Sequence, residues 1–230
     1  MSYPINYPTP QNANVQIFNR NTGSSGSQSP TQTWVKPQGA SFVWFTLIGA
    51  GANGDGTNGG GSGVVTNFMC PAFLIPDSLN IEVGLSLGVH TRIWYQYTSG
   101  AGSAAYELIG AYSATSATAP TAYGANYFTA MGFFQSVGGQ NGSTGTVTAS
   151  ATTFLSGGGS AGGTSTSNYG YSSGPVGAGT DRSGFFQFQP IIVSTGGFGG
   201  TITGIATGGI GSGGGVAGIG GPGLVVIITW

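Results

Sequence analysis

Charged side chains are nearly missing from this sequence. Four Lys or Arg and five Asp or Glu are all the charges among 230 residues, and the formal net charge is -1. So few cations cannot neutralise many phosphates, so we expect no nucleic-acid partner. A surface without charges also lacks the repulsion that keeps proteins apart. This composition favours a protein that works inside an assembly.

Cysteine, histidine and long apolar runs are equally scarce. Cys70 is the single cysteine, so no internal disulfide forms and we expect a buried, small apolar side chain. His90 is the single histidine, and no catalytic triad or metal cluster is built around it with ordinary spacing. We therefore predict no enzyme, no cofactor and no metal site. No run is apolar for the length of a membrane span, and the start "MSYPINYPTP" lacks the features of a secretory leader, so neither is expected.

Glycine and aromatic residues are abundant instead. The chain holds 47 Gly, 13 Phe, 10 Tyr and 4 Trp, with a mean hydropathy of +0.14. Disorder by composition usually requires low hydrophobicity and high net charge, and this chain has neither. The composition predicts an ordered protein with glycine-rich loops.

Short apolar or alternating runs separated by Gly, Ser, Thr and Asn predict strands, and no helical period of useful length occurs. The fold class is therefore all-β, a sandwich or a jelly-roll-like domain with long glycine-rich loops. Residues 1–14 form an extended N-terminal arm, and 15–230 form one domain with glycine-rich tracts at 157–179 and 196–223. The expected strands lie within 15–22, 31–37, 40–50, 63–69, 79–84, 90–98, 105–113, 125–139, 147–156, 184–195 and 224–229.

Two of these runs are apolar almost throughout, "ASFVWFTLIGA" (40–50) and the terminal "LVVIIT" (224–229). Strands this apolar are typical of positions buried on both faces, so we predict that they pair in one sheet. The terminal strand then closes the domain, and Trp230 anchors its end. Low solvent exposure is expected for Phe42, Trp44, Phe45, Leu47 and Ile48.

Some glycines recur at every third residue, at 208, 211 and 214 and again at 215, 218 and 221. Such spacing permits close-packed extended helices, because the glycine face lets neighbouring chains approach. Polyglycine-II-like segments therefore stay open as a description of these tracts.

Two sequence patterns resemble functional sites, a dinucleotide-binding loop and a pair of catalytic carboxylates, but neither pattern is complete. Gly49, Gly51 and Gly54 follow a strand in dinucleotide-fingerprint spacing, but the residues after them cannot form the helix that the fingerprint needs. Glu82 and Glu107 could form the carboxylate pair of a glycosidase. Glu82, however, lies in an alternating strand, where a solvated outward position is the simpler expectation.

Tyrosines together with Ser, Gly and Asn have the composition of adaptable recognition loops, most clearly in 95–127 and 164–180. Aromatic side chains in strands are also ordinary core or subunit-interface residues. If the chain contacts a receptor, the candidates are Tyr95, Tyr97, Tyr112, Tyr123, Tyr169 and Tyr171.

Three stretches carry a resemblance: "TWVKPQGASFVWFTLIGAGANGDG", "GGGSGVVTNFMCPAFLIPDSLNIEVG" and "GGIGSGGGVAGIGGPGLVVIITW". In order and spacing they resemble glycine-rich virion structural proteins of the bacteriophage tail-fibre, spike or capsid-associated type, over about a third of the chain. The resemblance implies a non-enzymatic structural protein that is assembled in the host cytoplasm and located in the virion. Its partners would be copies of itself and other virion proteins.

Other function classes stay open beside this one. The first alternative is a receptor-binding adhesin whose tyrosine-rich loops contact a host glycan or protein. A glycine-rich coat or ice-binding protein of cellular origin is a further alternative, although the regular threonine arrays that favour ice binding are missing.

Overall fold

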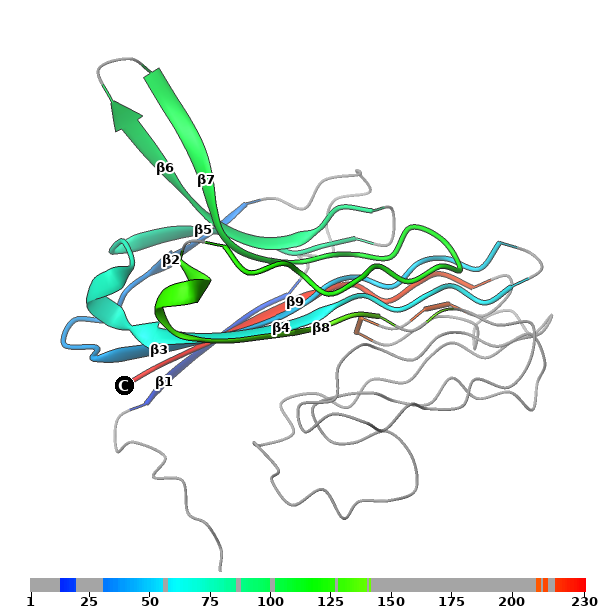
Figure 1. Cartoon of the computed structure of the whole chain (residues 1–230), viewed down its shortest axis with the longest axis horizontal. Coiled ribbons are helices and arrows are strands. Elements are labelled where there is room, and N and C mark those ends of the chain that lie inside the picture. The colour runs from blue at the N-terminus through cyan, green and yellow to red at the C-terminus, as the bar shows by residue number, and fades with distance from the viewer. Residues whose placement is uncertain are drawn as a thin grey trace, which may run out of the picture.

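The computed structural model describes residues 13–19, 31–55, 58–85, 88–99, 102–126, 128–139, 141, 210–211, 213–214 and 218–230. This part of the chain is all-β, as predicted, with two antiparallel sheets and no α-helix among the described residues (Figure 1). No helix that is long and apolar enough to cross a membrane occurs among them. Two short 3-10 helices, η1 (Ala72–Leu74) and η2 (Thr129–Met131), are the described helical segments.

The first sheet has five strands in the order β1-β9-β3-β4-β8, so the last strand of the chain lies near its centre. Its strands are β1 (Asn14–Phe18), β9 (Leu224–Thr229), β3 (Phe42–Ile48), β4 (Val65–Pro71) and β8 (Phe133–Val137).

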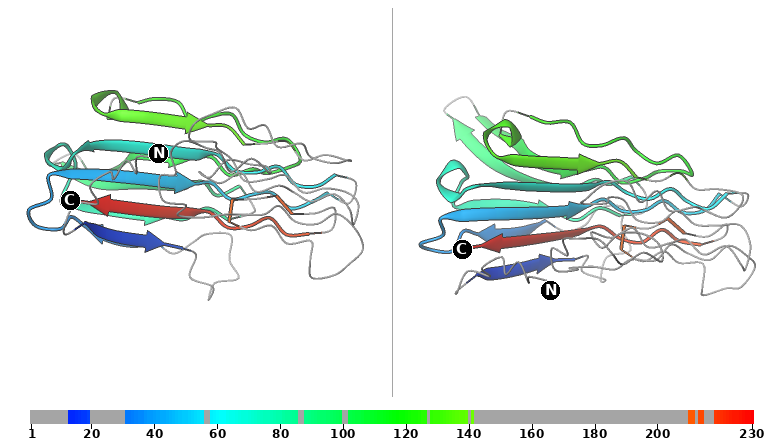
Figure 2. Two further views of the ribbon diagram at one scale, coloured as in Figure 1. Left: turned by 90° about the horizontal axis from the view of Figure 1, so that it is seen from below. Right: turned by 60° about the horizontal axis from the view of Figure 1, so that its bottom comes forward.

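The second sheet has four strands in the order β2-β5-β6-β7. Its strands are β2 (Gln32–Val35), β5 (Ser78–Glu82), β6 (Thr91–Ser99) and β7 (Gly102–Ala111). The two sheets form separate layers, consistent with a β-sandwich, and the β6–β7 hairpin projects beyond them (Figures 1 and 2).

The core lies between the sheets. Trp34 of β2 meets Phe45 of β3 edge-on with ring centroids 6.2 Å apart, and Phe45 stacks on Phe68 of β4 at 6.2 Å. Cys70 is buried in this cluster as expected, and burial raises the pKa of its thiol to about 11. At that pKa the thiol stays protonated near neutral pH and behaves as a small apolar group.

The predicted pairing of the two most apolar strands is confirmed. β9 pairs antiparallel with β3 from Val43↔Thr229 to Ile48↔Leu224, and β1 covers the other edge of β9. The ring of Trp230 stacks on Phe42 with centroids 5.9 Å apart, and its carbonyl accepts the Ser41 and Phe42 amides. The end of the chain is therefore held in the sheet.

Two expectations of low exposure were wrong in part. Phe42 is 39% exposed and Trp44 is only half-buried, whereas Phe45 and Leu47 are fully buried. The reason is the alternation of the strand: Val43, Phe45 and Leu47 face the other sheet, and Phe42 and Trp44 point to the opposite face.

Several predictions fall wholly or largely outside the described residues. These are the strands at 147–156 and 184–195, the tract at 157–179, most of the tract at 196–223, and the arm apart from residues 13 and 14. Asn14 is already the first residue of β1. Within 125–139, only the second half is a strand, because η2 occupies Thr129–Met131.

Two phenylalanines of β3 provide a matched test of the core. Phe45→Ala removes a fully buried ring and should lower the free energy of unfolding by about 3–5 kcal/mol. Phe42→Ala removes a partly exposed ring and should cost clearly less. Denaturant titration of both variants measures the difference, and equal losses would contradict the assignment of the two faces.

Candidate functional site

Beyond one end of the sheets, the chains that leave β3, β4, β7 and β9 run on side by side without forming strands (Figures 1 and 2). We call the described residues among 49–64, 112–119 and 210–223 the glycine-rich end. Most of its glycines are buried, and its chains are joined by backbone hydrogen bonds.

These hydrogen bonds repeat at three-residue intervals. The Gly51 and Gly54 amides donate to the carbonyls of Gly221 and Gly218, at 2.9 and 3.0 Å. The Gly60 and Gly63 amides likewise donate to Gly214 and Gly211, at 2.8 and 2.9 Å. A β-ladder would bond to one neighbour with a period of two, so this end of the molecule is built differently from the sheets.

The same segment also bonds to other neighbours. Gly61 donates to Ser116 and Val64 donates to Tyr112, both at 2.9 Å. Gly49 in turn donates to Val64, at 2.8 Å. One extended segment therefore contacts several chains around it, which requires backbones to approach closely on more than one side.

Glycine is required for this approach. A Cβ added at Gly63 would lie far inside contact distance of the Gly49 carbonyl, and one at Gly60 would do the same at Ala52. The colliding atoms are backbone, so no side-chain rotation relieves them. The glycine content of this region is thus a packing requirement.

The fingerprint spacing at Gly49, Gly51 and Gly54 has a structural explanation in these contacts. All three amides donate to backbone carbonyls of neighbouring chains. A pyrophosphate site would need such amides to be available for the ligand. Here they hold the glycine-rich end together.

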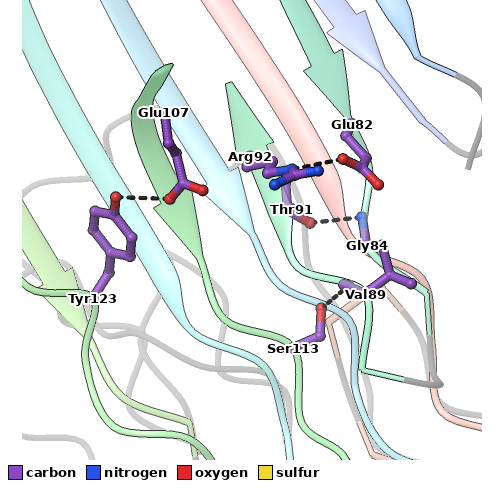
Figure 3. Close-up of polar contacts among 8 residues, drawn as sticks. All are labelled: Glu82, Gly84, Val89, Thr91, Arg92, Glu107, Ser113 and Tyr123. Carbon is purple, nitrogen blue, oxygen red and sulfur yellow. Dashed lines mark hydrogen bonds and ion pairs between the residues drawn. The ribbon is translucent and has the colours of Figure 1, made fainter. Parts of the chain in front are cut away.

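Two buried hydroxyls lie where the sheets meet the glycine-rich end (Figure 3). Thr91 Oγ1 accepts the Gly84 amide at 2.9 Å and donates to the Ile48 carbonyl at 2.7 Å, which links the two sheets. Ser113 Oγ accepts the Ala50 amide at 2.9 Å and donates to the Val89 carbonyl at 2.6 Å.

The outer face of the four-stranded sheet collects chemically active side chains. Glu82, Arg92 and Gly110 stand side by side on β5, β6 and β7, and Trp94 is paired with Glu107. The alternation that turns Ile81 and Ile93 into the core turns these residues outward. We call the following set the polar face: Glu82, His90, Arg92, Trp94, Glu107, Tyr112 and Tyr123.

Two polar contacts organise this face (Figure 3). Arg92 Nε donates to Glu82 Oε2 at 2.6 Å, and Tyr123 Oη donates to Glu107 Oε1 at 2.8 Å. Burial and the Glu107 hydrogen bond both raise the pKa of Tyr123, so its phenol remains a donor. A Cβ at Gly110 would lie 2.6 Å from Glu107 Oε1 and 2.8 Å from the Tyr123 ring, so a glycine leaves room for this contact.

Glu82 was expected to be solvated, and that expectation was wrong. Its residue exposure is only 8%, and its carboxylate is paired with the partly exposed Arg92. The ion pair offsets the cost of burying the carboxylate.

His90 lies at the end of the polar face near the glycine-rich end. Its ring meets Tyr112 edge-on at 4.9 Å, and its Nδ1 accepts the Ser113 amide at 3.0 Å. Partial burial lowers the pKa of His90, and nearby Arg92 lowers it further, whereas Glu107 and Glu82 act in the opposite direction. The neutral imidazole, which can accept a hydrogen bond, is therefore favoured.

The predicted receptor tyrosines separate into two groups. Tyr112 and Tyr123 belong to the polar face, with ring centroids 5.3 Å apart. Tyr95 and Tyr97 follow Ile93 on the other face of β6, where Tyr95 stacks on Tyr106 at 5.7 Å. Tyr169 and Tyr171 lie outside the described residues.

Sequence reasoning did not assemble the polar face. Alternation along 90–98 puts Arg92 and Trp94 on one side of the strand, but the contributions of β5, β7 and Tyr123 depend on strand pairing. A bulge at Leu108, opposite the Ile93–Trp94 step, also sets which residues of β7 point outward.

A second surface lies on the outer face of the five-stranded sheet. The registers align one apolar residue from each strand in the order Val15, Ile228, Trp44, Met69 and Phe133, which we call the apolar row. Val15 is 54% exposed and Phe133 is 50% exposed, and Ile228, Trp44 and Met69 are half-buried. Apolar side chains exposed in this continuous arrangement are typical of interaction sites.

No group of His, Cys, Asp or Glu that could hold a metal ion occurs in the described part of the chain. No protein-family model matches this sequence, and no curated protein is similar to it.

The glycine-rich end makes a prediction with an internal control. Gly63→Ala should destabilise the protein by more than about 1 kcal/mol, the typical effect of a single substitution. The reason is that the added Cβ collides with backbone atoms of Gly49. Gly124→Ala has nothing within 4 Å of the added Cβ and should be neutral or slightly stabilising. Thermal unfolding of both variants measures this, and similar midpoints would contradict the close packing at Gly63.

The lowered pKa of His90 predicts that the stability of the protein depends on pH. Its folded-state pKa lies below the ordinary value of 6.5, so the unfolded chain binds the proton more readily. The contribution of His90 is present above that value and is lost as pH falls through the folded-state pKa. The thermal unfolding midpoint should therefore decrease as the pH is lowered from about 7 to below 6.5.

The control for this effect is His90→Gln, whose amide oxygen can accept the Ser113 amide without titrating. The variant should show a smaller decrease over the same range. An identical decrease in both proteins would assign the effect to other groups.

Proposed function

We propose that this protein is a non-enzymatic structural subunit of a virus particle, either capsid-associated or part of a tail fibre. The observation that carries the proposal is the apolar row, which crosses all five strands of one sheet and contains no charged residue. A subunit that assembles with copies of itself and with other virion proteins requires such a surface.

The symmetry of the proposed contact fits the composition. In a two-fold contact each residue approaches its own copy or near neighbours, so charges would meet like charges. The apolar row avoids this repulsion entirely. Burial of Val15 and Phe133 would also remove exposed apolar area from water.

We further propose that the glycine-rich end is polyglycine-II-like and that the domain is jelly-roll-like. The support for the first is the three-residue interval of the hydrogen bonds from Gly51 and Gly54 and from Gly60 and Gly63. An extended helix with three residues per turn presents the same side to a given neighbour at every third residue. A rigid rod of this kind suits a particle component.

A receptor-binding adhesin is the second candidate, and the projecting β6–β7 hairpin favours it (Figure 1). Tyr97 and Tyr106 on this hairpin are 56% and 48% exposed. Exposed tyrosines provide large contact area at a low entropic cost. In this reading the hairpin contacts a host protein or glycan.

Two measurements test the leading proposal. Immunogold electron microscopy of particles purified from the source of the gene should place the protein in the virion, and unlabelled particles would contradict it. Sedimentation of the isolated chain at micromolar concentration should show a homo-oligomer.

A charge in the apolar row should disrupt that oligomer. Phe133→Lys introduces one at an exposed position of the row and should yield monomers. Val35→Lys, at an exposed position of the other sheet, is the matched control and should leave the oligomer intact. A stable wild-type monomer, or an oligomer unaffected by Phe133→Lys, would overturn the assembly role of the row.

A further inference from the structure

We infer that the polar face binds a neutral carbohydrate, with Trp94, Glu107 and Arg92 as its central contacts. This inference is independent of the virion proposal, because a sugar-binding face has the same chemistry in any location. It also uses a different surface from the hairpin tyrosines Tyr97 and Tyr106.

The concentration of functional groups is the first reason. Six of the nine charged residues lie in the described part of the chain, and three of them, Glu82, Arg92 and Glu107, stand on this one face. The single histidine joins them at its end. In a chain with so few charges, their concentration on one face points to binding.

The contacts of the cluster hold its groups in fixed positions. Glu82 orients the Arg92 guanidinium through Nε, and Tyr123 orients the Glu107 carboxylate through Oε1. The Nη groups of Arg92 and Oε2 of Glu107 have no hydrogen-bond or ion-pair partner among the described residues. Fixed donors and acceptors lose little entropy when a ligand binds.

Trp94 supplies the apolar component. Trp94 is two residues from Arg92 on the same face of β6, and it pairs with Glu107 on β7. Its side chain is half-buried. Its buried Nε1–H has no acceptor among the described residues, which is unusual for a tryptophan. An indole ring at the surface can stack on the C–H face of a sugar ring, and ligand sites typically combine such a ring with a few placed polar groups.

The charges select the ligand class. Two carboxylates and one guanidinium leave this face with one net negative charge when His90 is neutral, which disfavours an anion. A cation would use only the carboxylates and would meet Arg92. A neutral sugar hydroxyl both donates and accepts, so it matches Glu107 and Arg92 at once.

The test is a glycan array probed with the full-length chain, carrying neutral, sialylated, uronate-containing and amino-sugar oligosaccharides. We expect retention on neutral oligosaccharides. Calorimetric titration with the best-retained neutral oligosaccharide should then show at least about tenfold weaker binding for Trp94→Ala and for Glu107→Gln.

The controls separate binding from folding. Glu107→Gln preserves side-chain volume, so it decides the outcome if Trp94→Ala lowers the unfolding midpoint. Tyr97→Ala removes an exposed ring from the opposite face of the same strand and should leave the affinity unchanged. No retained glycan, retention chiefly of charged glycans, or unchanged affinity in Glu107→Gln would overturn the inference. Immunogold labelling is unaffected by any of these results, so failure here is distinguishable from failure of the virion proposal.

Discussion

The structure depends on backbones that approach one another more closely than any side chain would allow. At Gly60 and Gly63 the neighbouring chain occupies the position of a Cβ. The amide of each glycine donates a hydrogen bond to another segment, not to the one that an added Cβ would meet. Hydrogen bonding therefore replaces side-chain packing as the source of cohesion at this end of the molecule. Glycine costs conformational entropy on folding, and amide–carbonyl bonds shielded from water offset that cost.

The sheets and the glycine-rich end therefore form one continuous structure. The strands β3, β4, β7 and β9 are directly continuous with the chains of the glycine-rich end. The strand registers must therefore be compatible with the three-residue spacing of the hydrogen bonds there. Thr91 and Ser113 lie where the two patterns meet, and their hydroxyls bond to backbone groups on both sides. The central place of β9 follows from the same requirement. The segment before it runs alongside residues 51–54 and thereby delivers the last strand between β1 and β3.

The sequence predicts the sheets better than the site, for a physical reason. Apolar periodicity is local, so the strands and the β3–β9 pairing could be inferred from the runs at 40–50 and 224–229. Exposure depends on which face is covered, and alternation in β3 could not reveal that the face of Phe42 and Trp44 is less covered than that of Phe45. The polar face requires the β5–β6 and β6–β7 registers and the loop that carries Tyr123, and none of these is local. Glu82 illustrates the consequence, because its partner Arg92 is assigned only by the β5–β6 register.

The proposals give the outer faces of the two sheets different roles, and the scarcity of charge makes these roles compatible. On the five-stranded sheet the apolar row carries no charge, so nothing opposes contact with another apolar surface. On the four-stranded sheet Arg92, Glu107 and His90 would have to lose water in such a contact, at a considerable cost. Protein association is therefore favoured on the first face and disfavoured on the second. The proposed contact through the first face would leave the second face accessible to a small polar ligand, so the two proposals are compatible in one subunit.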